Sequence, residues 1–479
     1  MKLACNWADR AGETEYHEMR KDSSQKDLAL QPRLAALQVL KEVNKDGRYA
    51  NISLKENLRN RSLTGRDAAF TTQLVYGCLE KQITIDYYLR KLANLKRVNP
   101  WIENILRLGA YQILFMDGVP DFAACNEAVK LCKAHGLYAL KGFVNGILRN
   151  IARKKEKLMQ PDPNLSTAEN LSLLYSYPQW LVEKWIKDYG QVLAEDIMKP
   201  INAGNMTTIR VNTMKTSKEV LRDELLSLGL EVYNGLHVSE SLRVSNGGDV
   251  GESVLFQSGC FTVQGESSML VSHIVDPQPG ETILDACSSP GGKAIHMAEL
   301  MNGQGRVVAW DIHAHRVDLI KVNCLRMGAE IVEPSLVDAS VPDSAWNDQF
   351  DRVLIDAPCS GLGIVHKKPD IKLNISQEAL QELPELQAKI LSACRSYVKP
   401  GGVLVYSTCT INPAENEEII RAFLANNPEY YLEDVLSIVP DSLHSAVQNR
   451  LIQLIPSRHG IDGFFIARMR RSLFDRRSQ

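Results

Sequence analysis

Thr282-Ile-Leu-Asp285 and the stretch that follows it, Ala286-Cys-Ser-Ser-Pro-Gly-Gly-Lys293, decide the fold class of this 479-residue chain. A short apolar run gives way to a turn of small residues, and a helical pattern begins at Gly292. Two successive glycines let the backbone approach a ligand closely, and the first turn of a helix offers unpaired N–H groups. We predict a strand, a ligand-binding turn and a helix here.

The same alternation of strands and helices continues from residue 259 to residue 472. Further strands are predicted at Arg306–Asp311, Ile331–Val332, Asp351–Asp356 and Gly402–Tyr406, with helices between them. This order is typical of an α/β domain with a doubly wound parallel sheet. The last apolar run, Gly463–Arg468, is predicted to be an edge strand.

The first third of the chain follows a different pattern. Helical periodicity runs from Pro32 to Lys157 without strand-like alternation, so we predict an all-α domain over residues 28–160. Gln160-Pro-Asp-Pro-Asn164 has the composition of a linker. Residues 161–258 then combine short strands, such as Thr207–Val211, with a helix over Ser217–Leu228. They are predicted to form a linker and a small α+β subdomain.

The charge of the chain is divided unevenly between these parts. The net charge is only −2, but residues 1–160 hold 27 Lys and Arg against 17 Asp and Glu, whereas the remainder holds 28 against 40. A basic first third indicates contact with a polyanion. The basic run at the end of the helical region is equally compatible with a solvated helix end. It consists of Arg149, Arg153, Lys154, Lys155 and Lys157.

The apolar stretches, the first residues and the cysteine spacing indicate the cellular compartment of the protein. No stretch approaches the ~20 apolar residues of a membrane helix, and the first 27 residues lack the apolar core of a signal peptide. Residues 1–27 are predicted to be a disordered tail or a start-site extension ahead of Met19, and residues 473–479 a basic tail. The ten cysteines form no CxxC pair and no zinc-type cluster, which predicts reduced thiols in the cytoplasm and no bound metal.

Acidic residues at predicted strand ends indicate the type of ligand. Asp311 ends the second strand nineteen residues after Gly292, where a carboxylate can accept hydrogen bonds from ribose hydroxyls. Asp338 and Asp356 lie at two further strand ends. The glycine pattern is neither GxGxxG nor GxxxxGK[ST], which argues against a dinucleotide oxidoreductase and a P-loop NTPase. An adenosine-type ligand is favoured over the alternative of a plain tight turn with Asp311 as a helix cap.

Two cysteines lie just past predicted strand ends. Cys359 follows Asp356, and Cys409 follows the next strand in Ser407-Thr-Cys-Thr410. Because parallel strands present their carboxyl ends at one edge of the sheet, the two thiols would converge if the strands are neighbours. Either alone is more simply a buried spacer. Their paired placement favours nucleophilic chemistry.

Taken in order, these motifs resemble the Sun-domain family of RNA cytosine-5 methyltransferases, in its bacterial 16S ribosomal RNA branch of the RsmB (Sun/Fmu) type. The matching segments are Asp285–Lys293, Asp356–Gly363 with Lys368-Pro-Asp370, Tyr406–Cys409 and Asp462–Ala467. The helical domain resembles the NusB RNA-binding fold, and Arg210-Val-Asn212 resembles the family's linking subdomain. Ser288-Ser289 departs from the usual Ala-Ala, and Leu373 stands where Trp is common.

This resemblance implies a Rossmann-like, class I methyltransferase domain at residues 259–472 that uses S-adenosylmethionine. The implied reaction joins a cysteine covalently to a cytosine and methylates carbon 5. Cys409 would be the nucleophile, Cys359 would assist product release, and Asp356 would contact the cytosine. The implied cofactor residues are Cys287, Ser288, Ser289, Pro290, Gly291, Gly292, Lys293, Asp311, Asp338 and Asp356.

The resemblance also implies the partners. The expected substrate is ribosomal RNA, specifically 16S ribosomal RNA before the subunit is fully assembled, bound by a monomeric protein without membrane or metal. Lys293 could either lower a thiol pKa or contact phosphate. A non-catalytic RNA-binding protein would be expected to have lost a cysteine or the cofactor loop, and this sequence retains both.

Overall fold

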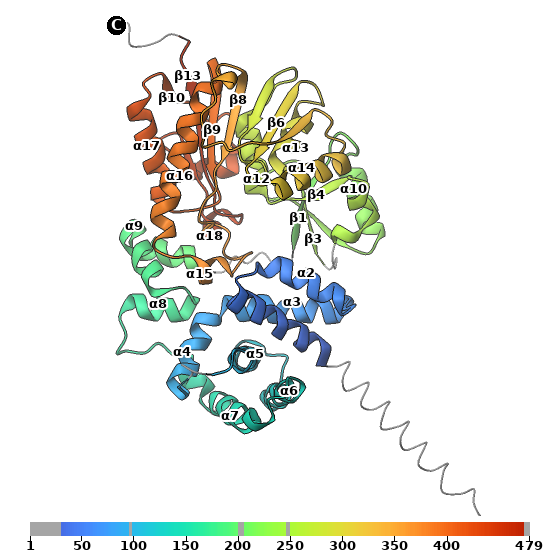
Figure 1. Ribbon diagram of the computed structural model, residues 1–479, viewed down its shortest axis with the longest axis vertical. Helices are drawn as coiled ribbons and strands as arrows, with labels where there is room; N and C mark the ends of the chain where they lie inside the picture. The colour runs from blue at the N-terminus through green and yellow to red at the C-terminus, as the bar shows by residue number, and fades with distance from the viewer. Residues whose placement is uncertain (1–29, 95–97, 200–205, 246–249, 474–479) are drawn as a thin grey trace, which may run out of the picture. The chain divides into compact units, whose positions relative to one another are not determined.

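The computed structural model describes residues 30–94, 98–199, 206–245 and 250–473, and the chain divides into two compact units (Figure 1). One unit comprises Met1–Gln191 together with Lys368–Asn374, and the other comprises Val192–Lys367 and Ile375–Gln479. The predicted tail at residues 1–27 lies outside the described residues, as does the basic tail beyond Leu473. No helix among the described residues is long and apolar enough to cross a membrane.

The first unit is helical throughout its described part, as predicted. Residues 30–46 are helical. The helices that follow are α2 (Ala50–Asn60), α3 (Gly65–Glu80), α4 (Gln82–Leu92), α5 (Pro100–Phe115), α6 (Asp121–Ala134), η1 (Tyr138–Leu140), α7 (Lys141–Leu158), α8 (Thr167–Tyr175), α9 (Gln179–Met198) and α15 (Ile371–Asn374). Asn99 caps α5 by accepting from Trp101 N, with Pro100 at its first position. Helix α5 is the central helix, because it is buried along most of its length and packs against α3, α4, α6 and α7.

The helical unit extends beyond the predicted boundary at residue 160. After the Pro-rich loop the chain returns to the same unit, where Thr84 Oγ1 donates to the Leu173 carbonyl at 2.6 Å and α8 packs against α4. The unit ends at Gln191, next to Gly190, which interrupts α9 with φ 75°. Leu373, from the segment Lys368–Asn374, packs against the hydrophobic core of this unit. The predicted linker is therefore a loop inside the helical unit.

The second unit begins with a small antiparallel sheet. Its strands are β1 (Thr207–Val211), β2 (Glu231–Asn234), β3 (Ser241–Ser245) and β4 (Phe261–Val263), in the order β2-β3-β1-β4, with α10 (Lys218–Ser227) and the short η2 (Val250–Glu252) and α11 (Val254–Gln257). Their apolar side chains form a separate small core that includes Ile209, Leu221 and Phe261. This agrees with the prediction of an α+β subdomain.

The large sheet carries the rest of the unit. Its parallel strands are β5 (Thr282–Asp285), β6 (Arg306–Asp311), β7 (Val332–Leu336), β8 (Phe350–Asp356) and β9 (Val398–Thr408), in the order β9-β8-β5-β6-β7. The chain moves outward from β5 to β7 and then returns to β8 on the other side of β5. In such sheets a ligand crevice forms where this reversal occurs, outside the carboxyl ends of the strands.

Helices cover both faces of this sheet (Figure 1). Alternate residues along one strand enter different cores: Ile283 packs with α12 (Glu266–Val275), α13 (Gly292–Leu300) and α14 (Ala314–Met327), whereas Leu284 packs with α16 (Ala379–Cys394) and α17 (Glu417–Asn426). Because successive side chains of a strand point to opposite faces, both faces of β5 are buried. The predicted doubly wound α/β arrangement is confirmed.

The prediction of a final edge strand was wrong. Strand β13 (Phe465–Arg471) lies inside the sheet, antiparallel to β9, β12 (Leu451–Gln453) and β10 (Tyr430–Leu432), and β11 (Val447–Gln448) extends the sheet beyond β12. Strands β10, β11 and β12 have only two or three residues each, which is too short for a period-two pattern to appear in the sequence. Short additional elements are η3 (Ser344–Trp346), η4 (Arg395–Tyr397), η5 (Pro413–Glu415), η6 (Asp441–Ala446) and α18 (Pro456–His459).

Candidate active site

The turn between β5 and α13 is fixed to its neighbours through its backbone. Ala286 N donates to the Leu354 carbonyl at 2.9 Å, and Ser288 N donates to the Trp310 carbonyl at 2.8 Å. Gly291 has φ 96°, and a Cβ there would lie 3.1 Å from Ile320 Cγ2, so this position requires glycine. The turn is therefore held in one shape by both adjoining strands.

Arg210 supports this turn from the small sheet. Its guanidinium is fully buried, donates to the Gly292 carbonyl at 2.8 Å and pairs with Glu299 at 2.8 Å. Asn212 donates from Nδ2 to the carbonyls of Gly259 and Met327 at 2.9 and 2.8 Å. Arg210 and Asn212, noted in the sequence only as a family resemblance, thus tie β1 to the helices of the large sheet.

Asp285, at the end of β5, is a buried carboxyl group. It has no exposed surface, and neither its oxygens nor the Ser288 hydroxyl makes a well-formed hydrogen bond among the described residues, although Ser288 and the Cys287 backbone N–H lie close enough to offset part of the rise in the pKa of Asp285. Burial and the negative charge of Asp356 raise the pKa of Asp285 to about 7. Unpartnered buried polar atoms are expensive, so this end of the loop is suited to a polar ligand that would supply the missing partners.

The raised pKa of Asp285 leads to a testable pH dependence. Between pH 3.8, its ordinary pKa, and pH 7 the folded chain binds a proton at this group that the unfolded chain has lost, so its contribution to stability falls as pH rises. Asp285→Asn should therefore gain stability relative to the wild type by a few kcal/mol between pH 4 and 8. Thermal unfolding of cofactor-free protein across this range measures the difference. The exposed Asp318→Asn serves as the control, and a parallel pH dependence in wild type and Asp285→Asn would contradict the assignment.

Asp311 and Asp338 lie at the ends of neighbouring strands, as the sequence predicted. Asp311 Oδ1 accepts from His313 N at 2.9 Å, just before α14. Asp338 Oδ1 accepts from Ser340 N at 2.9 Å and from Ser340 Oγ at 2.7 Å. Among the described residues no donor reaches Oδ2 of either carboxylate. Asp311 can therefore serve both as a helix cap and as a ligand-binding carboxylate. Its Oδ1 accepts from the backbone before α14, and its Oδ2 is available to a ligand.

The remaining loop residues divide between packing and exposure. Cys287 packs against the hydrophobic core beneath α16, and burial raises its pKa well above the usual value, which keeps it a neutral thiol. Ser289 is half-buried and Pro290 is exposed, and the Pro290 carbonyl accepts from Asn323 Nδ2 at 3.0 Å. Pro290 thus contacts α14 through its backbone.

Cys359 and Cys409 meet at the edge of the sheet. Strands β8 and β9 are parallel neighbours with Asp356 opposite Ser407, and the Sγ atoms of the two cysteines are 3.3 Å apart. The expectation that these two thiols, fifty positions apart in the sequence, would converge is confirmed. The hydrogen bond with Cys409, burial and the negative charge of Glu415 raise the pKa of Cys359 well above its usual value. Cys359 is therefore held as a neutral thiol.

Asp356 connects this pair of strand ends to the turn between β5 and α13. Its Oδ2 lies 2.5 Å from Lys293 Nζ, and its Oδ1 accepts from Ser407 Oγ at 2.7 Å. Burial alone would lower the pKa of Lys293, but the charge of Asp356 and the hydrogen bond to it raise the pKa instead. Lys293 is therefore a permanent cation beside this carboxylate, which favours the first of the two roles that the sequence left open, stabilisation of a thiolate.

Glu415 organises both cysteine loops, a role that no sequence pattern predicted. This fully buried carboxylate accepts from Ser360 N at 2.8 Å, Ser360 Oγ at 2.6 Å, Asn412 Nδ2 at 2.9 Å and Gln387 Nε2 at 3.1 Å. Ser360 follows Cys359 and Asn412 lies three residues after Cys409. The sequence feature that could have identified Glu415 is an acidic residue two positions after Pro413. This combination is common at helix starts and is therefore not specific.

Replacing Glu415 should separate the two loops. In Glu415→Gln an amide NH2 would replace one oxygen and face the donors Ser360 and Asn412, which costs about 1–3 kcal/mol of stability per unpaired group. We expect turnover to fall at least about tenfold, because small displacements of reacting groups are costly. The exposed Glu417→Gln, which loses only an ion pair with Arg421, is the matched control. Equal turnover in the two variants would contradict this role.

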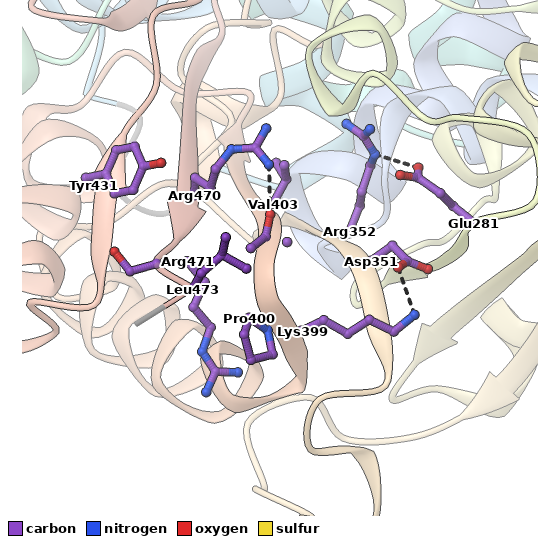
Figure 2. A pocket seen from close by; sticks show the side chains of 13 residues that line it. Glu281, Asp351, Arg352, Lys399, Pro400, Val403, Tyr431, Arg470, Arg471 and Leu473 are labelled. Carbon is purple, nitrogen blue, oxygen red and sulfur yellow. Dashed lines mark hydrogen bonds and ion pairs between the residues drawn. The ribbon is translucent and has the colours of Figure 1, made fainter. Parts of the chain in front are cut away.

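A separate cavity of about 550 Å³ opens at the other end of the same strands (Figure 2). It is lined by Asp351 and Arg352 at the start of β8 and by Lys399 near the start of β9. Its charges are paired, with Arg352 on Glu281 at 2.6 Å and Lys399 on Asp351 at 2.7 Å (Figure 2). The cavity is therefore distinct from the strand ends that carry the cysteines.

In the helical unit, the basic run lies on α7. Arg149, Arg153, Lys154 and Lys157 are exposed, and Lys155 is half-buried. None of the five forms an ion pair with an acidic residue in the described ranges. Within the described part of the chain their positive charge is therefore not neutralised by ion pairs, as contact with a polyanion requires.

Sequence comparison identifies relatives of the whole chain. Residues 272–470 match the family described as 16S rRNA methyltransferase RsmB/F, residues 30–153 match the NusB family, and residues 177–251 match the ferredoxin-like domain of RsmF/B-like methyltransferases. The probable ribosomal RNA small subunit methyltransferase B of Bacillus subtilis is 38% identical over 441 residues, covering 91% of this chain and 98% of the relative. This chain belongs to the RsmB/F methyltransferase family.

Other relatives agree with this membership. The ribosomal RNA small subunit methyltransferase B of Shewanella oneidensis is 31% identical to this methyltransferase, covering 91% of this chain and 98% of the relative. Among solved structures, PH0851 superposes with a TM-score of 0.78 at 28% identity, covering 91% of this chain and 98% of the other. A methyltransferase homologue from Pyrococcus horikoshii, at 27% identity, gives a TM-score of 0.52 and covers 64% of this chain and all of the other. The predicted NusB and α/β methyltransferase domains are thus confirmed.

Proposed function

We propose that this family member transfers a methyl group from S-adenosylmethionine to carbon 5 of a cytosine in small-subunit ribosomal RNA, through a covalent bond between Cys409 and the base. The observation that carries the proposal is the 3.3 Å approach of Cys359 and Cys409 at the ends of adjacent strands, next to Asp356. The relatives from Bacillus subtilis and Shewanella oneidensis, both named as ribosomal RNA small subunit methyltransferases, support the choice of ribosomal RNA.

The residues at the strand ends fit S-adenosylmethionine. The unpartnered Asp285 and Ser288 can bond its polar groups, the loop at Gly291 admits close approach of a ligand, and Asp311 and Asp338 each leave Oδ2 available. When bound there, S-adenosylmethionine supplies an electrophilic methyl group. Asp311 would hold the ribose, and Asp356 would lie near the methyl end.

The chain's own groups account for activation of the base. Carbon 5 of cytosine becomes nucleophilic only when a nucleophile adds to carbon 6. The Cys409 thiolate, favoured by the cation of Lys293, forms the bond to carbon 6. The electron pair of the C5–C6 double bond moves toward carbon 4 and N3, and N3 takes a proton from solvent water. Asp356 contacts the cytosine edge and stabilises this protonated ring.

Release of the product reverses the addition. After carbon 5 has formed its bond to the methyl group, its hydrogen leaves as a proton to solvent water and its electron pair forms the C5–C6 double bond. The bond between carbon 6 and Cys409 breaks with its electron pair going to sulfur, and N3 returns the proton that it gained to solvent. Cys359 lies 3.3 Å from the departing sulfur and is protonated, so it can donate to the leaving thiolate.

RNA binding is assigned to the helical unit. The base must leave its stack to reach the cysteines, which favours single-stranded or loop RNA as the substrate. The exposed cations of α7 would contact phosphates and add salt-dependent affinity without sequence choice.

Bisulfite sequencing of total RNA tests the function directly. RNA from cells lacking the gene should lose a 5-methylcytosine in 16S ribosomal RNA, and wild-type protein, but not Cys409→Ala, should restore it. Loss of a transfer RNA site with 16S RNA unchanged would overturn the substrate. An unchanged pattern in all RNA would overturn the activity.

A further inference from the structure

A cluster of two histidines and a glutamate lies outside the proposed reaction site. Glu240 precedes β3 in the small sheet, His273 is on α12 and His296 is on α13, and one ligand atom from each lies within 4.8 Å of the others. Glu240 Oε1 is 2.6 Å from His273 Nε2 and 2.9 Å from His296 Nε2. Carboxylate and imidazole groups from three separate elements thus converge on one point.

The orientation of His296 is not explained by hydrogen bonding. Its side chain is only 1% exposed, and among the described residues neither ring nitrogen has a hydrogen-bond partner. Its Nε2 approaches Glu240 Oε1 to 2.9 Å, the distance of an ion pair, and Nδ1 has no such neighbour among the described residues. Side chains that bind the same metal ion lie close together without being hydrogen-bonded to each other, because each is directed at the ion.

The distances are also suitable for a small cation. Ligands of a tetrahedral zinc ion at about 2.0–2.2 Å from the metal lie roughly 3.3 Å from one another. The separations of Glu240 Oε1 from His273 Nε2, 2.6 Å, and from His296 Nε2, 2.9 Å, would need to open by about 0.7 and 0.4 Å to reach this spacing. Glu240 Oε2 accepts from Ser239 Oγ at 2.8 Å, which fixes the carboxylate as outer partners fix metal ligands.

The carboxylate of Glu240 keeps its negative charge at this cluster, without a cationic partner among the described residues. Arg210, the nearby cation, is paired with Glu299 at 2.8 Å. No Lys or Arg of the described residues forms an ion pair with Glu240. The side chain of His273 is 30% exposed, so solvent can reach the cluster from that side.

We propose that Glu240, His273 and His296 bind one zinc ion, with water as the remaining ligand. The ion would fasten the small sheet, through Glu240, to α12 and to α13, the helix that begins at the cofactor loop. This replaces the expectation of a protein without metal. No residue of the methyl-transfer chemistry is a ligand, so failure of this proposal would leave the proposed function untouched.

Metal titration of the full chain tests the site. Protein stripped with a chelator should bind one equivalent of Zn²⁺ by calorimetry, and its thermal unfolding temperature should rise on binding. Glu240→Gln and His273→Asn should each weaken binding at least tenfold and abolish the thermal shift. His315→Ala, which removes an exposed histidine stacked on His313, is the matched control and should behave as the wild type.

Cobalt(II) in place of zinc distinguishes this site from the thiols. The Co²⁺ form should show d–d bands without thiolate charge-transfer bands, because no cysteine is a ligand. Binding that survives in both Glu240→Gln and His273→Asn but disappears in a Cys359→Ala/Cys409→Ala double variant would overturn the proposal, as would the absence of stoichiometric binding by the wild type. Because His273 is half-exposed, His273→Asn keeps the test valid if a buried substitution prevents folding.

Discussion

Cys409→Ala should abolish methyl transfer to RNA while leaving the binding of S-adenosylmethionine intact. Without the bond between sulfur and carbon 6, carbon 5 has no means of becoming nucleophilic, so we expect a loss on the order of 10³-fold or more. The polar groups assigned to the cofactor, at Asp285, Ser288 and Asp311, do not include this thiol. Single-turnover methyl transfer and calorimetric titration with S-adenosylmethionine measure the two properties separately.

The control for this variant is Cys260→Ala, which removes a half-buried cysteine from the small sheet and should retain full activity. Cys409→Ser should remain inactive, because a hydroxyl is a much weaker nucleophile than a thiolate. Activity in Cys409→Ala together with none in Cys359→Ala would exchange the roles of the two cysteines. Activity in both single variants would reject covalent catalysis by either.

The sequence predicted those parts of the site that lie at strand ends. A strand, a turn with glycines and a helix are local patterns, and parallel strands necessarily place their carboxyl ends at one edge. The convergence of Cys359 and Cys409 required only that β8 and β9 be neighbours, which the register of Asp356 with Ser407 confirms. The expected strand topology therefore predicted this contact, which the spacing of the two cysteines alone did not.

Features that depend on contacts distant in the sequence were not predictable in this way. Glu415 became visible as an organising group only when Ser360 and Gln387, 55 and 28 residues away, were found bonded to it. The end of the helical unit was missed for a similar reason. The Pro-rich loop has the local composition of a linker, and the return of α8 to α4 rests on contacts such as Thr84 with Leu173, 89 residues apart.

Cys359→Ala should trap the enzyme on its RNA. Addition and methyl transfer need only Cys409, so they should proceed, but elimination would lack the protonated thiol that lies 3.3 Å from the departing sulfur. A covalent complex of protein and RNA should therefore accumulate and appear as a slow band on a denaturing gel. Digestion and mass spectrometry should place the methylated nucleotide on Cys409.

The double variant Cys359→Ala/Cys409→Ala separates this complex from adventitious crosslinks, since it should give no band under the same conditions. Glu417→Gln, with both thiols intact, should show normal turnover and no accumulated complex. Product formation by Cys359→Ala at the wild-type rate, with no band at any time during turnover, would exclude Cys359 from product release. In that case Cys409 would remain the nucleophile, and a group other than Cys359 would assist its release from the base. Lys293 would be the first residue to substitute, because its cation can stabilise the leaving thiolate.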